Sequence, residues 1–409
     1  MNRAQIAAGA LAALLLVPSP GRAGTDNDEV ATLSALVAKL AAQVEALSAQ
    51  VAEQGEQLRR LSSQPPVEAT QAATPQPPPP AAPATAAGGN YFNPSISLIG
   101  NFLAVGGHTP IEGLPSSDLR ESELGLQAVV DPYARADFFL SFGEEGVDVE
   151  EGYLTFTQLP ADLLVKVGRQ RAAFGKINGL HLHTLPWPDE PLTTVNLLGG
   201  EEGWIGTGVS VSRLLPLGNL FSEATVQVFR GDAEGLFEAR RRQDLAYNGH
   251  YRLFADLTEA TNLDVGLSYG YGPNGITETS STSLAGLDLT LRWKPLRTGL
   301  YRSAIVRGEL IASRRHGEGG SDDRLGWFLS GEYQLARRWS VGARYELADA
   351  VDAPERVDRG QALLVTFSPT EFSQLRAEIR RRFYAQHGTA LEGLLQLQFA
   401  IGAHGAHPF

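Results

Sequence analysis

The chain has 409 residues, a formal net charge of −12 and no cysteine. The negative charge argues against a general nucleic-acid-binding protein, because such proteins need a basic surface. The absence of cysteine excludes disulfides and thiolate metal sites. The length allows one or two domains with a sizeable core.

The N-terminal segment predicts export from the cytoplasm. Arg3 precedes an apolar run over 6–17, and small residues follow up to Ala23. This order is typical of a secretory signal peptide, here residues 1–23. The apolar run is shorter than the roughly 20 residues that a membrane-spanning helix needs, and no later run approaches that length.

The next two segments predict a helix and a spacer. Apolar residues alternate spacings of three and four, which predicts an α-helical coiled coil over 28–62. The alternative is a single amphipathic helix lying on another surface. Residues 63–89 are rich in proline and alanine and predict an extended linker. The heptad positions are Val30, Leu33, Val37, Leu40, Val44, Leu47, Val51, Gln54, Leu58 and Leu61.

Residues 90–409 predict an all-β transmembrane antiparallel barrel. Short segments alternate apolar with polar residues, as in 374–383, where Leu375 and Ile379 oppose Arg376 and Glu378. Segments of about ten residues suit strands that cross a bilayer. A soluble β-sandwich is the rival architecture. Sixteen strand candidates centre near residues 99, 125, 138, 153, 165, 208, 226, 250, 266, 289, 308, 329, 343, 364, 378 and 397.

Two sets of connections alternate along the predicted barrel. Short periplasmic turns and longer external loops are the expected asymmetry of such barrels. Tight turns are expected at 131–133, 160–161, 335–337 and 368–370. Longer loops are expected at 107–118, 231–243, 271–282, 315–323 and 349–358. The terminal aromatic, Phe409, resembles the assembly signal that the barrel assembly machinery reads in outer-membrane proteins.

The longest connection runs from Arg171 to Trp204. Long irregular loops in compact folds are usually functional. This loop carries apolar side chains, including Leu185 and Trp187, which must be buried. We therefore expect it to pack against the inner wall and narrow the lumen. The polar residues expected at this constriction are Lys176, His181, His183, Asp189, Glu190, Glu201 and Glu202.

Two histidines in this loop form a His-x-His pair. His181 and His183 project to one face if the segment is extended. Together with Asp189, they can ligate zinc or another divalent cation. The alternative is that the histidines hydrogen-bond the loop to the barrel wall. The sequence requires no other cofactor.

Charged residues of both signs fall on the predicted lumen face. Rings of arginine favour anions and rings of carboxylates favour cations. Interleaved signs favour salt-bridged ladders between strands instead. The residues expected to face the lumen are Arg307, Arg344, Glu346, Arg376, Glu378, Arg380 and Arg382.

Several of these motifs carry a family resemblance. The stretches Gly168–Arg169, Phe174–Asn178, His181–His183 and Pro186–Asp189, with Leu198–Glu202, resemble poorly characterised outer-membrane proteins labelled zinc-regulated receptors. In layout these are similar to the phosphate-selective porin O and P group. The resemblance covers 93–409 and implies a Gram-negative outer-membrane barrel with a transport role. Similarity to porins also implies a homotrimer, surrounded by outer-membrane lipid.

These features together predict a passive outer-membrane porin, with the coiled coil in the periplasm. One alternative is an envelope spacer that contacts the cell wall or another periplasmic partner through the coiled coil. Another is a metal-responsive outer-membrane transport protein. An outer-membrane lipase or protease is disfavoured, since the sequence has no recognisable hydrolase or phosphate-binding motif.

Overall fold

The computed structural model describes residues 94–402, apart from 112, 121, 145, 219 and 352. The predicted signal peptide, coiled coil, linker and terminal Phe409 therefore lie outside the described residues. Among the described residues, no helix is long and apolar enough to cross a membrane.

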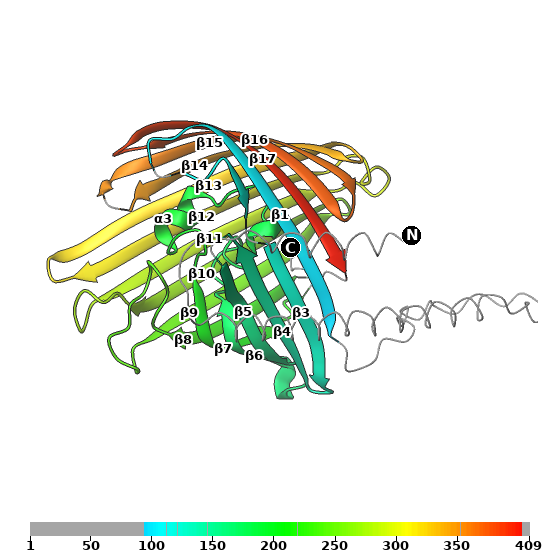
Figure 1. Ribbon diagram of the computed structural model, residues 1–409. Helices are drawn as coiled ribbons and strands as arrows, with labels where there is room; N and C mark the ends of the chain where they lie inside the picture. The colour runs from blue at the N-terminus through cyan, green and yellow to red at the C-terminus, as the bar shows by residue number, and fades with distance from the viewer. Residues whose placement is uncertain are drawn as a thin grey trace, which may run out of the picture. The chain divides into compact units, whose positions relative to one another are not determined.

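Sixteen long strands form one closed antiparallel sheet (Figure 1). Each pairs with its neighbours in the chain, and β1 pairs with both β3 and β17 to close the barrel. A short additional strand, β2 (Ser117–Leu119), pairs with β1. The long strands are β1 (Ser95–His108), β3 (Ser122–Asp131), β4 (Ala134–Gly143), β5 (Gly146–Phe156), β6 (Leu163–Arg171), β7 (Ile205–Leu214), β8 (Phe221–Arg230), β9 (Leu245–Thr258), β10 (Thr261–Pro273), β11 (Ser281–Trp293), β12 (Ala304–Gly317), β13 (Gly320–Ala336), β14 (Trp339–Ala350), β15 (Ala353–Thr370), β16 (Ser373–Tyr384) and β17 (Gly388–Gly402).

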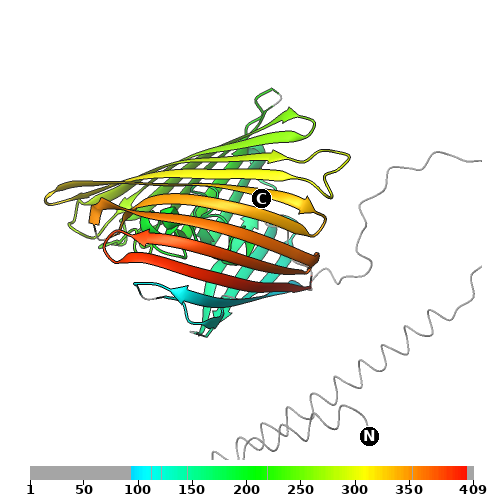
Figure 2. The same ribbon diagram turned by 90° about the horizontal axis from the view of Figure 1, so that it is seen from above.

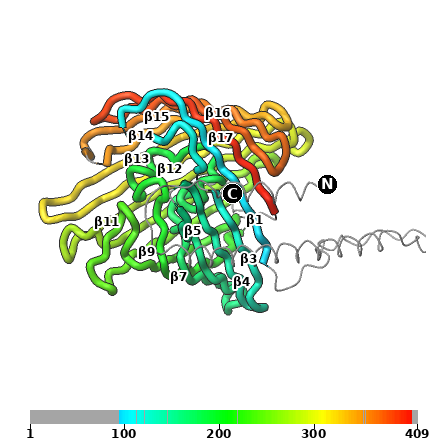
Figure 3. Tube along the Cα trace, in the orientation of Figure 1, coloured from blue at the N-terminus to red at the C-terminus, as the bar shows by residue number. Residues whose placement is uncertain are grey.

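The strand prediction is confirmed, because each of the sixteen expected centres lies within one of these strands. The closing pair brings the two ends of the sheet together, with Ser97 opposite Gly402 (Figure 3). An even number of strands therefore places the start of β1 and the end of β17 at the same end of the barrel. We call this the terminal end, and the opposite end the loop end.

The connections differ in part from the sequence prediction. At the loop end, long segments join β1 to β3, β6 to β7 and β8 to β9. The prediction of long loops at 315–323 and 349–358 is wrong. Their residues continue the strands, so that only 318–319 and 351–352 connect the hairpins. Cross-strand pairing satisfies the backbone hydrogen-bonding groups of these polar residues. As a result, the hairpin β12–β13 extends beyond the neighbouring hairpins (Figure 2).

The two faces of the wall differ in polarity. On β16, Ile379 is 65% exposed, whereas the side chains of Arg380 and Glu378 on either side of it are buried. Exposure alternates in the same way on β15, where Leu363 is 68% exposed and its neighbour Leu364 is buried. A soluble protein buries apolar residues and exposes charged ones. This barrel has an apolar outer face and a largely polar inner face, which suits a lipid surrounding.

Candidate functional site: the loop inside the barrel

Residues 172–204, here called the inner loop, cross the interior of the barrel. The loop contains a 3₁₀ turn, η2 (Leu182–Thr184), and one short helix, α3 (Leu192–Leu197). Its backbone contacts strands on several sides. The Ala173 amide donates to Gln227 of β8 at 2.7 Å, and the side-chain amide of Gln398 on β17 donates to the His183 carbonyl at 2.8 Å. A segment that reaches such distant strands must pass through the lumen.

Asn178 joins the two ends of the inner loop. Its side-chain amide donates to the carbonyls of Ala172 and Trp204, at 2.8 and 3.0 Å. Its side-chain oxygen accepts the Trp204 amide at 2.7 Å. These buried hydrogen bonds hold a long insertion as a closed unit, because the polar groups have no water to replace their partners.

Gly175 makes the sharp entry of the inner loop possible. Its φ of +61° is unfavourable for other residues, and a Cβ here would approach the Glu309 side chain to 2.6 Å. The Gly175 amide donates to Ser268 Oγ at 2.8 Å. Glu309 then accepts the amides of Lys176 and Ile177 at 3.0 and 3.2 Å. The wall thus replaces the strand pairing that the chain loses when it leaves β6.

Two apolar clusters anchor the inner loop to the wall. In one, Trp187 packs edge-on against Phe328 of β13, with ring centroids 5.4 Å apart. In the other, Trp204 packs against Phe229 and Phe237, at 5.9 and 5.0 Å. All five rings are buried, as is Leu185, so the expected burial of the apolar side chains is found.

Asp189 lies at the centre of a charged network. Its Oδ1 is 2.7 Å from Arg344 of β14, and its Oδ2 is 2.8 Å from both Arg380 and Arg382 of β16. Burial raises the pKa of this carboxyl. The three guanidinium groups oppose burial and hold the pKa well below its ordinary value. Asp189 therefore stays ionised and fastens the middle of the loop to two strands.

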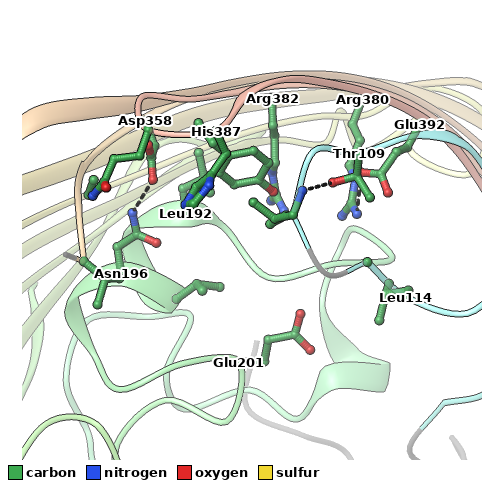
Figure 4. A pocket seen from close by; sticks show the side chains of 17 residues that line it. Thr109, Leu114, Leu192, Asn196, Glu201, Asp358, Arg380, Arg382, His387 and Glu392 are labelled. Atoms are coloured by element: carbon green, nitrogen blue, oxygen red, sulfur yellow. Dashed lines mark hydrogen bonds and ion pairs between the residues drawn. The ribbon is translucent and has the colours of Figure 1, made fainter. Parts of the chain in front are cut away.

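The buried strand charges form pairs across the wall. Glu346 accepts from Arg382 at 3.1 Å and lies 3.2 Å from Arg344. Arg380 also contacts Glu392, at 2.9 Å (Figure 4). Of these three contacts, only Arg380 with Glu392 is the neighbouring-strand pair that interleaved charges favour, since Arg344 shares β14 with Glu346 and Arg382 lies two strands from it. Others of the expected lumen residues lie on the same inner face, with Arg307 half-buried beside Glu332 and with Arg376 and Glu378 buried.

The expected constriction residues lie in different surroundings. Lys176 Nζ contacts Asp264 of β10 at 2.5 Å and is half-buried. Glu190 is buried, whereas Glu201 and Glu202 are exposed. Glu201 contacts Arg120 at 2.8 Å. The structure therefore separates the two exposed carboxylates from the buried centre of the loop.

The histidine pair does not meet Asp189, which the arginines occupy. Instead, His181 contacts Glu150 and Glu151 of β5 and Glu123 of β3. The prediction that Asp189 is the third metal ligand is therefore wrong, because its carboxylate is bound by the arginines of the charged network. The sequence reasoning missed the three glutamates. The adjacent pair at 150–151 interrupts the alternation of its strand and was the available signal.

Open spaces remain on both sides of the inner loop. At the loop end, a cavity of about 390 Å³ lies between α3, β16 and the β1–β3 connection (Figure 4). Asn196 of α3 bonds Asp358 at its edge, at 3.1 Å. Two further cavities, of about 370 and 200 Å³, both contact Lys176.

This geometry defines a porin-type barrel, and solved structures share the fold. An anion-selective porin from Comamonas acidovorans superposes with a TM-score of 0.52 at 13% identity, covering 76% of this chain and all of that one. A loop L8 deletion mutant of OmpT, an outer-membrane protein of Vibrio cholerae, gives 0.51 at 10% identity, covering 76% and 100%. Pseudomonas putida OprB gives 0.51 at 10% identity, covering 76% and 94%.

One sequence relative places the chain in a family. An uncharacterized protein of Aquifex aeolicus is 30% identical over 335 residues, covering 71% of this chain and 70% of its own length. The chain belongs to the family of that protein. No family model matches the sequence.

Proposed function

We propose that this protein is an outer-membrane porin, through which small solutes diffuse past a constriction formed by the inner loop. The observation that carries the proposal is a closed barrel, apolar outside and charged inside, with cavities on both sides of a fixed loop. An apolar outer face needs a lipid surrounding, and a charged interior holds water. No covalent chemistry is required for such a route.

The two cavities that contact Lys176, here called the lower cavities, support a preference for anions. The smaller one is lined by four cationic side chains and a single carboxylate, Glu332. Like-signed charges along a narrow aqueous path attract counter-ions and repel co-ions. We propose that small anions pass this part of the route more readily than cations. The four cations are Lys176, Arg292, Arg307 and Arg376.

Deleting residues 180–196 tests the constriction. The shortened protein should form a barrel with a higher single-channel conductance in planar bilayers, because the centre of the loop no longer occupies the lumen. Shortening another loop-end connection, by deleting 275–279, provides the control and should leave conductance unchanged. Barrel formation is checked by heat-modifiable migration on gels. A folded deletion protein with wild-type conductance would place the constriction elsewhere.

The same recording separates the porin from the envelope spacer. A spacer needs a barrel only as an anchor, and a barrel closed by its inner loop would carry no current. The wild-type protein should instead give stepwise currents. If correctly folded protein never carries current, the result would favour the spacer, with the predicted coiled coil as its contact to another layer.

We also propose that the barrel assembles as a homotrimer through the part of its wall that has the shortest strands, here called the low side. Strands β3 to β8 have 9–11 residues, whereas β9 to β17 have 12–18. On the low side, Val147 and Val226 are 75% and 60% exposed. Neighbouring copies can cover this apolar surface. Crosslinking of the protein in detergent, followed by mass measurement, should give a three-chain species, and a single-chain mass would contradict the trimer.

A further inference from the structure

The His181 ring lies within a cage of three glutamates. Its Nδ1 is 2.7 Å from Glu123 Oε2 and 3.0 Å from Glu150 Oε2. Its Nε2 is 2.8 Å from Glu151 Oε2. Each of these side chains is at most a tenth exposed. A single imidazole with carboxylates on both ring nitrogens is an unusual environment and requires an explanation.

A β-bulge builds this cage. In the pairing of β4 with β5, Phe139 is opposite Glu151 and Leu140 is opposite Val149, so Glu150 has no partner on β4. The extra residue lets the adjacent Glu150 and Glu151 both be buried, whereas a regular strand would point one of them outward. Bulges commonly re-aim side chains at functional sites.

The Nδ1 atom faces two carboxylate oxygens but carries at most one hydrogen. A hydrogen bond can therefore satisfy Glu123 or Glu150, but not both fully. The other oxygen of Glu150 is held by Arg171. The other oxygen of Glu123, Oε1, is buried and has no hydrogen-bond partner among the described residues. The carboxylates thus retain lone pairs directed at one point beside Nδ1.

Charge balance gives an independent argument. Three carboxylates share the cage, and Arg171 is the one guanidinium paired with them among the described contacts. Among the described residues, neutral imidazoles leave two negative charges of the cage uncompensated, and a protonated His181 leaves one. Unpaired buried charges are costly, so a bound cation would stabilise the cage. A divalent cation supplies the missing charge.

We propose that Glu123, Glu150 and His181 bind a divalent transition-metal ion, which fastens the inner loop to β3 and β5. One ligand atom from each lies within 4.8 Å of the others. Ligands about 2.1 Å from a tetrahedral ion lie roughly 3.4 Å apart. The two distances from His181 Nδ1, 2.7 and 3.0 Å, are shorter than this, so the carboxylates must move outward to admit the ion. Imidazole and carboxylate donors suit zinc, manganese or iron better than calcium or magnesium.

Glu151 takes the role of a positioning residue in this site. A metal-bound histidine usually donates its second ring N–H to a carboxylate, which orients the ring and raises its basicity. Glu151 Oε2 is the acceptor at Nε2, on the side of the ring opposite the ligands. Its other oxygen, Oε1, accepts the Arg171 backbone amide at 2.7 Å, which fixes the carboxylate in place. His183, whose Nδ1 is 3.5 Å from Glu123 Oε2, lies beside the ligands.

Metal titration of the folded protein tests the proposal. Wild-type protein in detergent is stripped with a chelator and titrated with zinc by calorimetry, and separately with cobalt by visible absorption. We expect one zinc per chain and the absorption bands of cobalt held by nitrogen and oxygen ligands. Glu123→Gln and His181→Gln should each weaken zinc binding by at least 100-fold. Loss of a residue that only supports a metal ligand can weaken binding by about 100-fold, so loss of a ligand itself should weaken it at least as much.

Glu309→Gln is the matched control, because Glu309 is another buried carboxylate that contacts the same loop. It should bind zinc as the wild type does. All variants are first tested for heat-modifiable migration. If a ligand variant does not fold, the wild-type titration still decides. Wild-type protein without stoichiometric zinc binding or cobalt bands would overturn the site and leave an imidazolium among carboxylates. Equal zinc affinity in all folded variants would overturn it as well.

Discussion

Asp189 Oδ1 lies 2.7 Å from Arg344 Nη2, and this ion pair joins the middle of the inner loop to β14. The same guanidinium stacks over the Trp187 ring, with its Cζ 4.8 Å from the centroid. One arginine therefore holds the loop through a charge and through an aromatic face. This point is the centre of the loop, far along the chain from both of its ends.

Asp189→Asn should loosen the loop without removing its bulk. The substitution leaves three buried arginines without their shared carboxylate, and breaking a buried ion pair in this way costs about 3 kcal/mol of the free energy of unfolding. Urea unfolding in lipid should measure the loss. Single-channel current should become noisier and shift toward anions, because one negative charge has left the lumen.

Glu278→Gln is the control for Asp189→Asn. Its carboxylate pairs with Arg241, and the two side chains are 68% and 48% exposed. Exposed ion pairs contribute little to stability because water and salt screen them, so stability and current should stay close to wild type. Equal effects of the two substitutions would mean that the Asp189 network does not hold the loop.

Glu190 should make the stability of the protein depend on pH. Burial raises the pKa of its carboxyl to about 8; Arg171 opposes the change, and Glu201 and Asp189 add to it. The unfolded value is near 4.5. Between these values the folded chain keeps a proton that the unfolded chain has lost. The contribution of this group to the free energy of unfolding is therefore present at low pH and is lost as pH rises toward 8.

The Glu190→Gln variant should lack this component. Its free energy of unfolding should fall less than that of the wild type as pH rises from about 5 to 8, since the amide does not ionise. Glu318→Gln, at an exposed turn, should keep the wild-type profile. Urea unfolding at several pH values measures both. Parallel profiles for Glu190→Gln and the wild type would show that the buried carboxyl does not titrate in this range.

The sequence predicts the wall of the barrel well, because alternation with period two is a local signal. A strand such as β16 shows its two faces directly, with Ile379 on one and Arg380 on the other. Loop lengths are less predictable. The polar residues of 315–323 resemble a loop, yet cross-strand pairing extends β12 and β13 through them.

The partners of the inner loop depend on tertiary structure and were not predictable. Nothing local relates Asp189 to Arg344 or Arg380, which are more than 150 residues away. The sequence did indicate that the loop had apolar residues to bury. The adjacent glutamates at 150–151 indicated an interrupted alternation, but the sequence could not show which residue bulges, since a bulge is defined only by pairing with β4.

Lys176→Gln should reduce the proposed preference for anions. Lys176 lines both lower cavities and contacts Asp264, which Arg252 also contacts at 2.6 Å. Removing the ammonium group therefore lowers the positive charge of both spaces while Asp264 keeps a partner. Reversal potentials in a salt gradient should shift toward cations.

Lys294→Gln removes the same charge from an exposed connection outside these cavities. It should leave the reversal potential close to wild type. If both substitutions change selectivity alike, the general field of the protein sets ion preference, and the lining of the lower cavities does not. If neither substitution changes selectivity, the ions do not pass near Lys176.

The barrel should fold without residues 1–89. Strand β1 pairs with β17 from Ser97 to His108, so the sheet closes with residues that all follow Pro94. The described residues of the barrel also belong to one compact unit. Residues 90–409, expressed alone and refolded into detergent, should show heat-modifiable migration and the conductance of the full chain. Asp189→Asn in this shorter protein should reproduce its effect in the full protein, because the network lies within the barrel. A fragment that never resists detergent before heating would show that barrel formation needs the N-terminal segments.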